Sequence, residues 1–178
     1  MSRGIRALVV FFAFVLIYTV ARGDLQHKST DTVIPNVSMC TAKQLSPTWI
    51  TGTGAAGSVF SWIQLTNNGS TCKLPTWLSV SSSRKGASSE NFARVANNSQ
   101  LARQDNSAIR PSKRGVVVVA DQSAYIAISF SDGYSCPPAD LVALSWKGET
   151  ATESTTLVPT YLATSCAGNS VVMSPVYR

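Results

Sequence analysis

Hydrophobic and polar residues alternate along several short segments of the chain, which is the pattern of strands in a half-buried β-sheet. In residues 124–130, Ala, Ile, Ile and Phe occupy every second position, and residues 59–66 alternate in the same way. Residues 116–120 form a continuous, mostly β-branched run, typical of a strand covered on both faces. The turn residues Asp121-Gln122-Ser123 then predict a hairpin between this strand and the next one.

The remaining segments predict an all-β fold. Further strands are expected at residues 77–81, 141–146, 155–162 and 171–176, and no segment of helical length carries a 3.6-residue period. About seven or eight short strands with frequent turn residues are typical of an antiparallel immunoglobulin-like β-sandwich. Residues 81–111 are polar and basic with little alternation, so we expect a long functional loop or a partly helical insertion there.

The N-terminal residues have the pattern of a secretory signal peptide. Arg3 and Arg6 precede an apolar run at 7–20, and small residues follow at a cleavage position after Gly23. The alternative is an uncleaved single-pass anchor, although the run is shorter than the roughly 20 residues that a spanning helix needs. We therefore expect a signal peptide at 1–23, a linker at 24–39 and one β-sandwich domain at 40–178, secreted or associated with the cell envelope.

Four cysteines, Cys40, Cys72, Cys136 and Cys166, are expected in the exported part. An even number of cysteines in an oxidising compartment predicts two disulfides, for which three connectivities are possible. The spacing favours Cys40 with Cys72 and Cys136 with Cys166, each closing a loop of about 30 residues and stabilising the fold by about 3.5 kcal/mol in the loop-entropy model. No metal site is expected, because CxxC spacing and additional histidine ligands are missing from the sequence.

The charge of the chain is concentrated in one region. The whole chain has a formal net charge of +6, and loss of residues 1–23 removes three arginines and no acidic residue, which leaves +3. Between residues 84 and 114, seven basic residues face only two acidic ones. Such a stretch predicts Coulomb attraction to anionic polymers, although a solvated basic loop is the simpler interpretation. The candidate ligand-binding residues are Arg84, Lys85, Arg94, Arg103, Arg110, Lys113 and Arg114.

Most catalytic chemistries find little support in the composition. The only histidine of the chain, His27, lies close to the expected new terminus, where a preorganised triad is hard to build. The GxGxxG pattern at 52–57 is followed by a strand rather than a helix, so we expect a glycine-rich turn entering a strand, and no nucleotide or other cofactor. A pair of carboxylates could still converge for hydrolysis, from among Asp121, Asp132, Asp140, Glu149 and Glu153.

The four tryptophans lie within or beside predicted strands, so core packing is favoured over a stacking platform for sugars or bases. They are Trp49, Trp62, Trp77 and Trp146.

The chain also resembles a known family of secreted proteins. The motifs CTAKQL at 40–45, GAAG at 54–57 and TNNGSTCKLP at 66–75, with CPPA at 136–139 and the late Cys166, resemble the secreted actinobacterial family catalogued as domain of unknown function 4232. The resemblance covers residues 40–178 and departs from the family at Thr76-Trp77. It implies an exported β-sandwich-like domain with two disulfides, and it implies no activity.

Together these features predict a non-catalytic binding domain of the cell envelope or the extracellular space. Its ligand is expected to be an anionic envelope polymer bound weakly by the basic stretch, whereas nucleic acid is a less favoured partner and membrane contact requires an uncleaved N-terminal segment. Two alternatives stay open: a secreted hydrolase that uses carboxylates, and a structural domain without a ligand.

Overall fold

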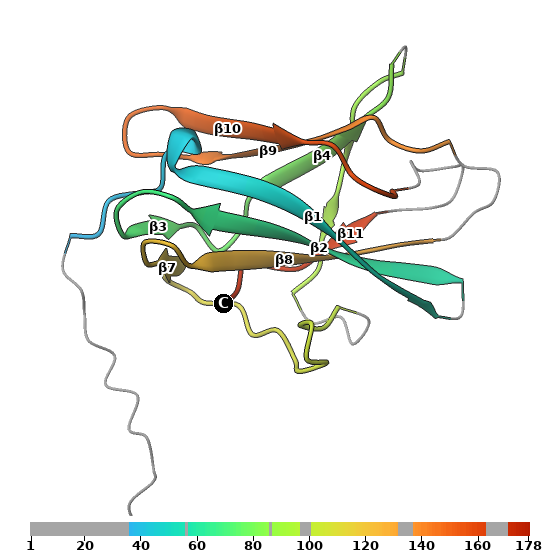
Figure 1. The fold of residues 1–178 in the computed structure, drawn as a ribbon, viewed down its shortest axis with the longest axis horizontal. Helices are drawn as coiled ribbons and strands as arrows, with labels where there is room; N and C mark the ends of the chain where they lie inside the picture. Colours follow the sequence, from blue (N-terminus) through green and yellow to red (C-terminus); the bar gives the residue numbers. More distant parts are fainter. Residues whose placement is uncertain (1–35, 56, 86, 97–100, 132–136, 163–170) are drawn as a thin grey trace, which may run out of the picture. The chain divides into compact units, whose positions relative to one another are not determined.

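Short strands dominate the structure, a computed structural model that describes residues 36–55, 57–85, 87–96, 101–131, 137–162 and 171–178 (Figure 1). Within these ranges it contains eleven strands and one 3₁₀ helix, in agreement with the predicted all-β class. They are η1 (Ala42–Gln44), β1 (Leu45–Ala55), β2 (Ser58–Asn67), β3 (Cys72–Leu74), β4 (Ser79–Ser83), β5 (Glu90–Asn91), β6 (Ala93–Arg94), β7 (Val116–Val118), β8 (Ser123–Ser131), β9 (Leu141–Lys147), β10 (Thr152–Leu157) and β11 (Val172–Met173).

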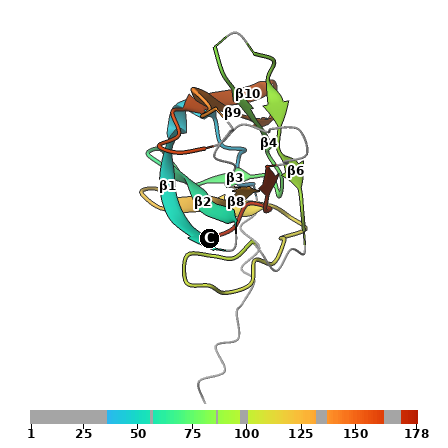
Figure 2. The same cartoon turned by 90° about the vertical axis from the view of Figure 1, so that its right-hand side faces the viewer.

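The strands form three sheets that are mostly antiparallel (Figures 1 and 2). The largest has the order β1-β2-β8-β11-β6, the second has the order β10-β9-β4-β5, and β3 pairs with β7 in a two-stranded sheet. Only the β11–β6 pairing is parallel among the strands described. One cluster of buried side chains draws on all three sheets, so the three share one hydrophobic core.

β1 and β2 form a long hairpin, and the glycine-rich segment lies at its far end. Their register runs from Leu45 opposite Asn67 to Ala55 opposite Ser58, with an irregularity between Thr51 and Gly54. A Cβ at Gly52 would lie only 1.9 Å from the backbone oxygen of Phe60, so a side chain at this position would collide with β2. The predicted glycine-rich turn into a strand is confirmed for Gly57, which lies in the turn before β2, whereas Gly52 and Gly54 lie inside β1.

β2 and β8 are the strands whose alternation the sequence predicts best. Alternate residues of β2, from Val59 to Asn67, are buried. β8 pairs with β2 over nine residues, from Ser58 opposite Ser131 to Thr66 opposite Ser123. The predicted hairpin between 116–120 and 124–130 is wrong, because β7 pairs with β3 instead of β8. The turn between them is held by Asn67, whose backbone oxygen accepts from Asp121 and whose N–H donates to Gln122.

The C-terminal residues pair with the edge of β8 that lies opposite β2. Tyr125 and Tyr177 form an isolated antiparallel bridge, and the Ser174 hydroxyl accepts the Ala127 N–H at 2.9 Å. The Ala127 side chain is buried although it belongs to the polar face in the sequence pattern. A second, smaller apolar cluster forms here from Leu101, Ala127 and Tyr177, with Trp62 packed against it.

Two tryptophans confirm the expectation of core packing. Trp49 and Trp146 are buried in the main core, Trp77 packs against it half-buried, and Trp62 belongs to the second cluster. The indole N–H of Trp146 donates to the Cys40 carbonyl oxygen at 2.8 Å.

The predicted disulfide between Cys40 and Cys72 is confirmed, and both residues are fully buried. It lies beside an additional pairing, because Met39 bridges Lys73 and the Lys73 N–H donates to the Ser38 oxygen. The second predicted pair, Cys136 and Cys166, lies outside the described residues, as does the expected signal peptide at 1–23.

Several element boundaries differ from the sequence predictions. β1 is an additional strand, and the strands expected at 77–81 and 155–162 are β4 (Ser79–Ser83) and β10 (Thr152–Leu157). Of the two alternatives for residues 81–111, a long loop or a partly helical insertion, the helical one is wrong for the described part, which holds β5, β6 and an Ala102–Ala108 bridge. Among the residues described, no helix is both long and apolar enough to cross a bilayer.

Candidate functional site

The seven basic residues predicted to bind a ligand do not share one element. Arg84 and Lys85 lie in the turn of the β4–β5 hairpin, Arg94 lies on β6, and the other four lie between residues 103 and 114. The β4–β5 hairpin and the segment 101–115 occupy opposite sides of both views in Figures 1 and 2. The structure thus divides the basic stretch into separate surfaces, and its binding role stays a prediction.

Some of these residues already have structural contacts. The Arg94 guanidinium lies 6.0 Å from the Trp77 ring centroid and donates to the Leu78 carbonyl oxygen at 3.2 Å. The Lys85 backbone N–H donates to the Asp140 carboxylate at 2.7 Å. Arg110, Lys113 and Arg114 are exposed in the segment before β7.

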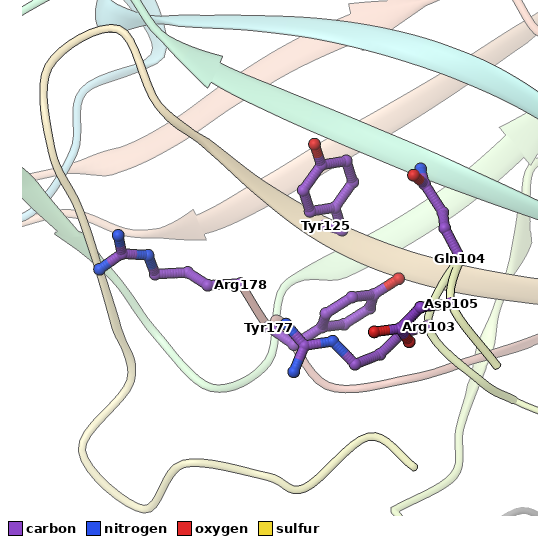
Figure 3. Close-up of a pocket in the computed structure, with 6 residues that line it drawn as sticks. All are labelled: Arg103, Gln104, Asp105, Tyr125, Tyr177 and Arg178. Atoms are coloured by element: carbon purple, nitrogen blue, oxygen red, sulfur yellow. The ribbon is translucent and has the colours of Figure 1, made fainter. Parts of the chain in front are cut away.

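Arg103 differs from the other six because it lines a hollow of about 210 Å³ together with two tyrosines (Figure 3). We call this the arginine–tyrosine hollow. Its residues come from three parts of the chain: a turn after β6, the start of β8, and the C-terminal segment. They are Arg103, Gln104, Asp105, Tyr125, Tyr177 and Arg178.

A tight turn positions Arg103 and Asp105. The Arg103 N–H donates to the Ser107 oxygen at 3.0 Å, and Asn106 adopts a positive φ of 62° that closes the turn. The Asp105 carboxylate accepts the Ser107 N–H at 2.9 Å. The turn is tied to β2 by the Trp62 indole, which donates to the Ala102 oxygen at 3.1 Å.

Backbone pairing holds the two tyrosines together. The N–H of Tyr125 donates to the Tyr177 oxygen at 2.8 Å, and the N–H of Tyr177 donates back at 3.0 Å. Their rings are stacked, with centroids 5.9 Å apart and planes inclined by 28°. The Arg103 guanidinium lies 5.3 Å from the Tyr177 ring centroid, within the range of a cation–π interaction.

The charges of the hollow are set by these contacts. Hydrogen bonds from the Ser107 side chain and backbone lower the pKa of Asp105, with a further contribution from the Arg103 charge, so Asp105 is ionised at neutral pH. Burial raises the pKa of Tyr177, against a smaller opposing effect of Arg103. Tyr177 therefore keeps its proton, and its O–H can donate. The hollow carries two guanidinium charges and one carboxylate.

Among the residues that the structure describes, the Tyr177 hydroxyl has no hydrogen-bond partner. Tyr177 is 7% exposed, and its hydroxyl oxygen is a buried atom without a donor or acceptor among the residues that the structure describes. In Figure 3 the hydroxyl points toward the side on which Gln104 and Asp105 lie. An unsatisfied polar group of this kind costs about 1–3 kcal/mol, which a ligand atom could recover.

Arg178 stands on the other side of the tyrosines (Figure 3). Its guanidinium donates to the Gln122 side-chain oxygen at 2.8 Å. This contact uses one of the five donors of the guanidinium, so the group remains able to bind an anion.

Three of the five carboxylates considered for hydrolysis accept hydrogen bonds from backbone N–H groups. Glu149 accepts the Met39 N–H at 3.2 Å, Glu153 accepts the Ala42 N–H at 2.7 Å, and Asp140 accepts from Lys85. Asp121 lies exposed in the β7–β8 turn, and Asp132 lies outside the described residues. In the described part of the chain, no group of acidic, histidine and cysteine side chains could hold a metal ion.

Two further hollows lie elsewhere. One of about 480 Å³ separates β1 from β10, and one of about 110 Å³ lies beside Arg84 and Glu90. Counting only described residues, none of the three hollows contains two carboxylates.

No protein-family model, curated protein sequence or solved structure matches the chain. The resemblance to domain of unknown function 4232 accordingly stays a prediction. Functional inference rests on the residues of the arginine–tyrosine hollow.

Sequence patterns identify only one of these six residues, Arg103, as a candidate. Tyr125 carries a weak signal, because it is an aromatic residue on the polar face of a well-predicted strand. Tyr177 and Arg178 carry none, because only the bridge between residues 125 and 177 brings them to the hollow.

Proposed function

We propose that the protein is an exported, non-catalytic binding domain that holds an anionic group of an envelope or extracellular polymer in the arginine–tyrosine hollow. The observation that carries this proposal is the pair of guanidinium groups, Arg103 and Arg178, beside two stacked tyrosines, one of which has a buried hydroxyl without a partner in the described structure.

The geometry of Arg103 supports binding of an oxyanion. Its guanidinium is oriented by the Tyr177 ring, and within the described residues it forms no ion pair or side-chain hydrogen bond. A guanidinium presents a planar set of donors that matches a carboxylate or phosphate in a bidentate manner. A preoriented guanidinium loses less conformational entropy on binding than a mobile lysine does.

The wider context of this proposal includes the fold and the location. We propose that the sheets pack as an immunoglobulin-like β-sandwich of the type found in domain of unknown function 4232. The buried Cys40–Cys72 disulfide agrees with, but only weakly supports, an oxidising compartment outside the cytoplasm. Within the sequence, the signal-peptide pattern at 1–23 supports export.

A binding experiment with two arginine variants tests the proposal. Binding to a carboxylated polysaccharide and to a glycerol-phosphate polymer is measured at low and at physiological ionic strength. We expect the binding to weaken as salt is added. Arg103→Ala should weaken it at least about tenfold, since a charge-assisted hydrogen bond contributes about 1.5–3 kcal/mol.

Arg110→Ala is the matched control, because Arg110 is an exposed arginine of the same basic stretch outside the hollow. It should change the affinity less than about twofold, as expected for a distant surface charge. An equal loss in both variants would show a diffuse electrostatic surface. Absence of binding to both polymers at low salt would remove the proposed function.

A further inference from the structure

The arginine–tyrosine hollow has mixed polarity as well as positive charge. The ionised Asp105 carboxylate is an acceptor on the same turn as Arg103, and the Gln104 amide offers both a donor and an acceptor. A ligand that fills this space next to the arginines must therefore present hydroxyl donors in addition to an anionic group.

The tyrosines add a second requirement, a ring-shaped ligand. Tyr125 is half-buried and stacks on Tyr177, so the pair forms an aromatic wall of the hollow (Figure 3). Aromatic side chains combine an apolar ring with a polar tip, which suits the C–H face and the hydroxyls of a sugar ring. An open glycerol-phosphate chain has no ring to pack against this wall.

The buried Tyr177 hydroxyl supplies a third requirement. As a protonated donor with no partner in the described part of the structure, it calls for an acceptor atom on the ligand. Sugar hydroxyl and ring oxygens are such acceptors, and they lie within a few bonds of the carboxylate in a sugar acid. Both kinds of group can therefore be satisfied by one residue of the polymer.

We infer that the ligand of the hollow is a sugar acid, that is, a hydroxylated ring bearing a carboxylate, within an acidic polysaccharide. This inference rests on the proposed function. Arg103 holds the carboxylate, the tyrosine wall packs against the ring, and Asp105 accepts from the ring hydroxyls.

Calorimetric titration of the full chain with three defined oligomers tests the inference. The probes are an oligogalacturonate, the neutral oligogalactose of equal length, and an oligomer of glycerol phosphate. The oligogalacturonate should bind about tenfold more tightly than each of the other two, the loss that one missing charged or ring contact would cause.

The variant Tyr177→Phe separates a binding role from a structural one. It removes only the hydroxyl, which has no partner in the described structure, so the stability of the fold should be unchanged or raised. The affinity for oligogalacturonate should nevertheless fall about threefold to tenfold, the contribution of one neutral hydrogen bond. A variant with unchanged affinity would overturn the role of this hydroxyl and, with it, the assignment of the ligand.

The outcomes distinguish the inference from the proposed function. Equal or tighter Arg103-dependent binding of the glycerol-phosphate oligomer would overturn the sugar-acid assignment and leave anion binding in place. Equal binding of the neutral oligogalactose would also overturn it, because the carboxylate would then contribute nothing. If none of the charged oligomers binds, both proposals fail.

Discussion

Replacement of Asn67 by alanine should destabilise the fold more than its small size suggests. The Asn67 side chain is fully buried at the end of β2 and forms three hydrogen bonds. Its amide donates to the Ser70 oxygen at 2.9 Å and to the Val118 oxygen at 3.0 Å, and its side-chain oxygen accepts the Gly69 N–H at 3.0 Å. One side chain thus joins β2, the turn before β3, and β7.

The expected magnitude follows from these three contacts. A neutral hydrogen bond contributes about 0.5–1.5 kcal/mol net, so three of them predict a loss of about 3 kcal/mol in the free energy of unfolding. The buried Val118 carbonyl would also lose its side-chain partner, which adds to the loss. Such a change is a large fraction of the total stability of a domain, which is typically about 5–15 kcal/mol.

Urea denaturation with the disulfide intact, followed by tryptophan fluorescence, measures this effect. Asn68→Ala is the matched control, because Asn68 is the neighbouring residue of the same type but exposed, and within the described residues its side-chain amide donates to Ser46 alone. The control should lose less than about 1 kcal/mol. If Asn67→Ala loses no more than Asn68→Ala, the assignment of Asn67 as the link between these elements is refuted.

Three further changes test the same framework. Asn67→Asp places a carboxyl against two carbonyl oxygens, which raises the pKa of this carboxyl in the folded state above its unfolded value. The stability of the variant relative to the native protein, measured by denaturation at several pH values, should therefore be best at about pH 3–4 and fall toward pH 7. The reverse trend would contradict this contact. Replacing Cys40 and Cys72 together by alanine should lower the free energy of unfolding by about 3.5 kcal/mol in denaturant titrations, given their separation of 32 residues, and a loss below about 1 kcal/mol would argue against this model. Gly52→Ala should lower the melting temperature, because the new Cβ would clash with Phe60. Gly54→Ala should leave the melting temperature unchanged, because its Cβ would lie 3.5 Å from the nearest atom. Equal shifts in the two variants would contradict the close approach at Gly52.

Sequence patterns predict the central strands of this fold and miss its edge. β2 and β8 are recognisable because one face of each is buried in the main core, which preserves a period of two. β1 lies at the edge of its sheet, where Pro47 and two glycines are tolerated and obscure the pattern. Propensity and turn residues also suggest the wrong partner for β7, since the pairing with β3 joins residues far apart in sequence.

The candidate site is less predictable than the fold. A local excess of positive charge correctly draws attention to Arg103, yet it gives equal weight to Arg84 and Lys85 on another hairpin. What singles out Arg103 is its position over Tyr177, which depends on the C-terminal segment packing against β8. Long-range contacts of this kind leave no periodicity or spacing in a single sequence.

Mapping the ligand by NMR tests the central claim most directly. Backbone amide signals of the ¹⁵N-labelled protein are followed during titration with oligogalacturonate at low salt. We expect the largest shifts at residues 101–109, at Tyr125 and at Tyr177, which surround the arginine–tyrosine hollow. Shifts concentrated instead at Arg84 and Lys85 in the β4–β5 hairpin, with residues 101–109 unchanged, would contradict the claim.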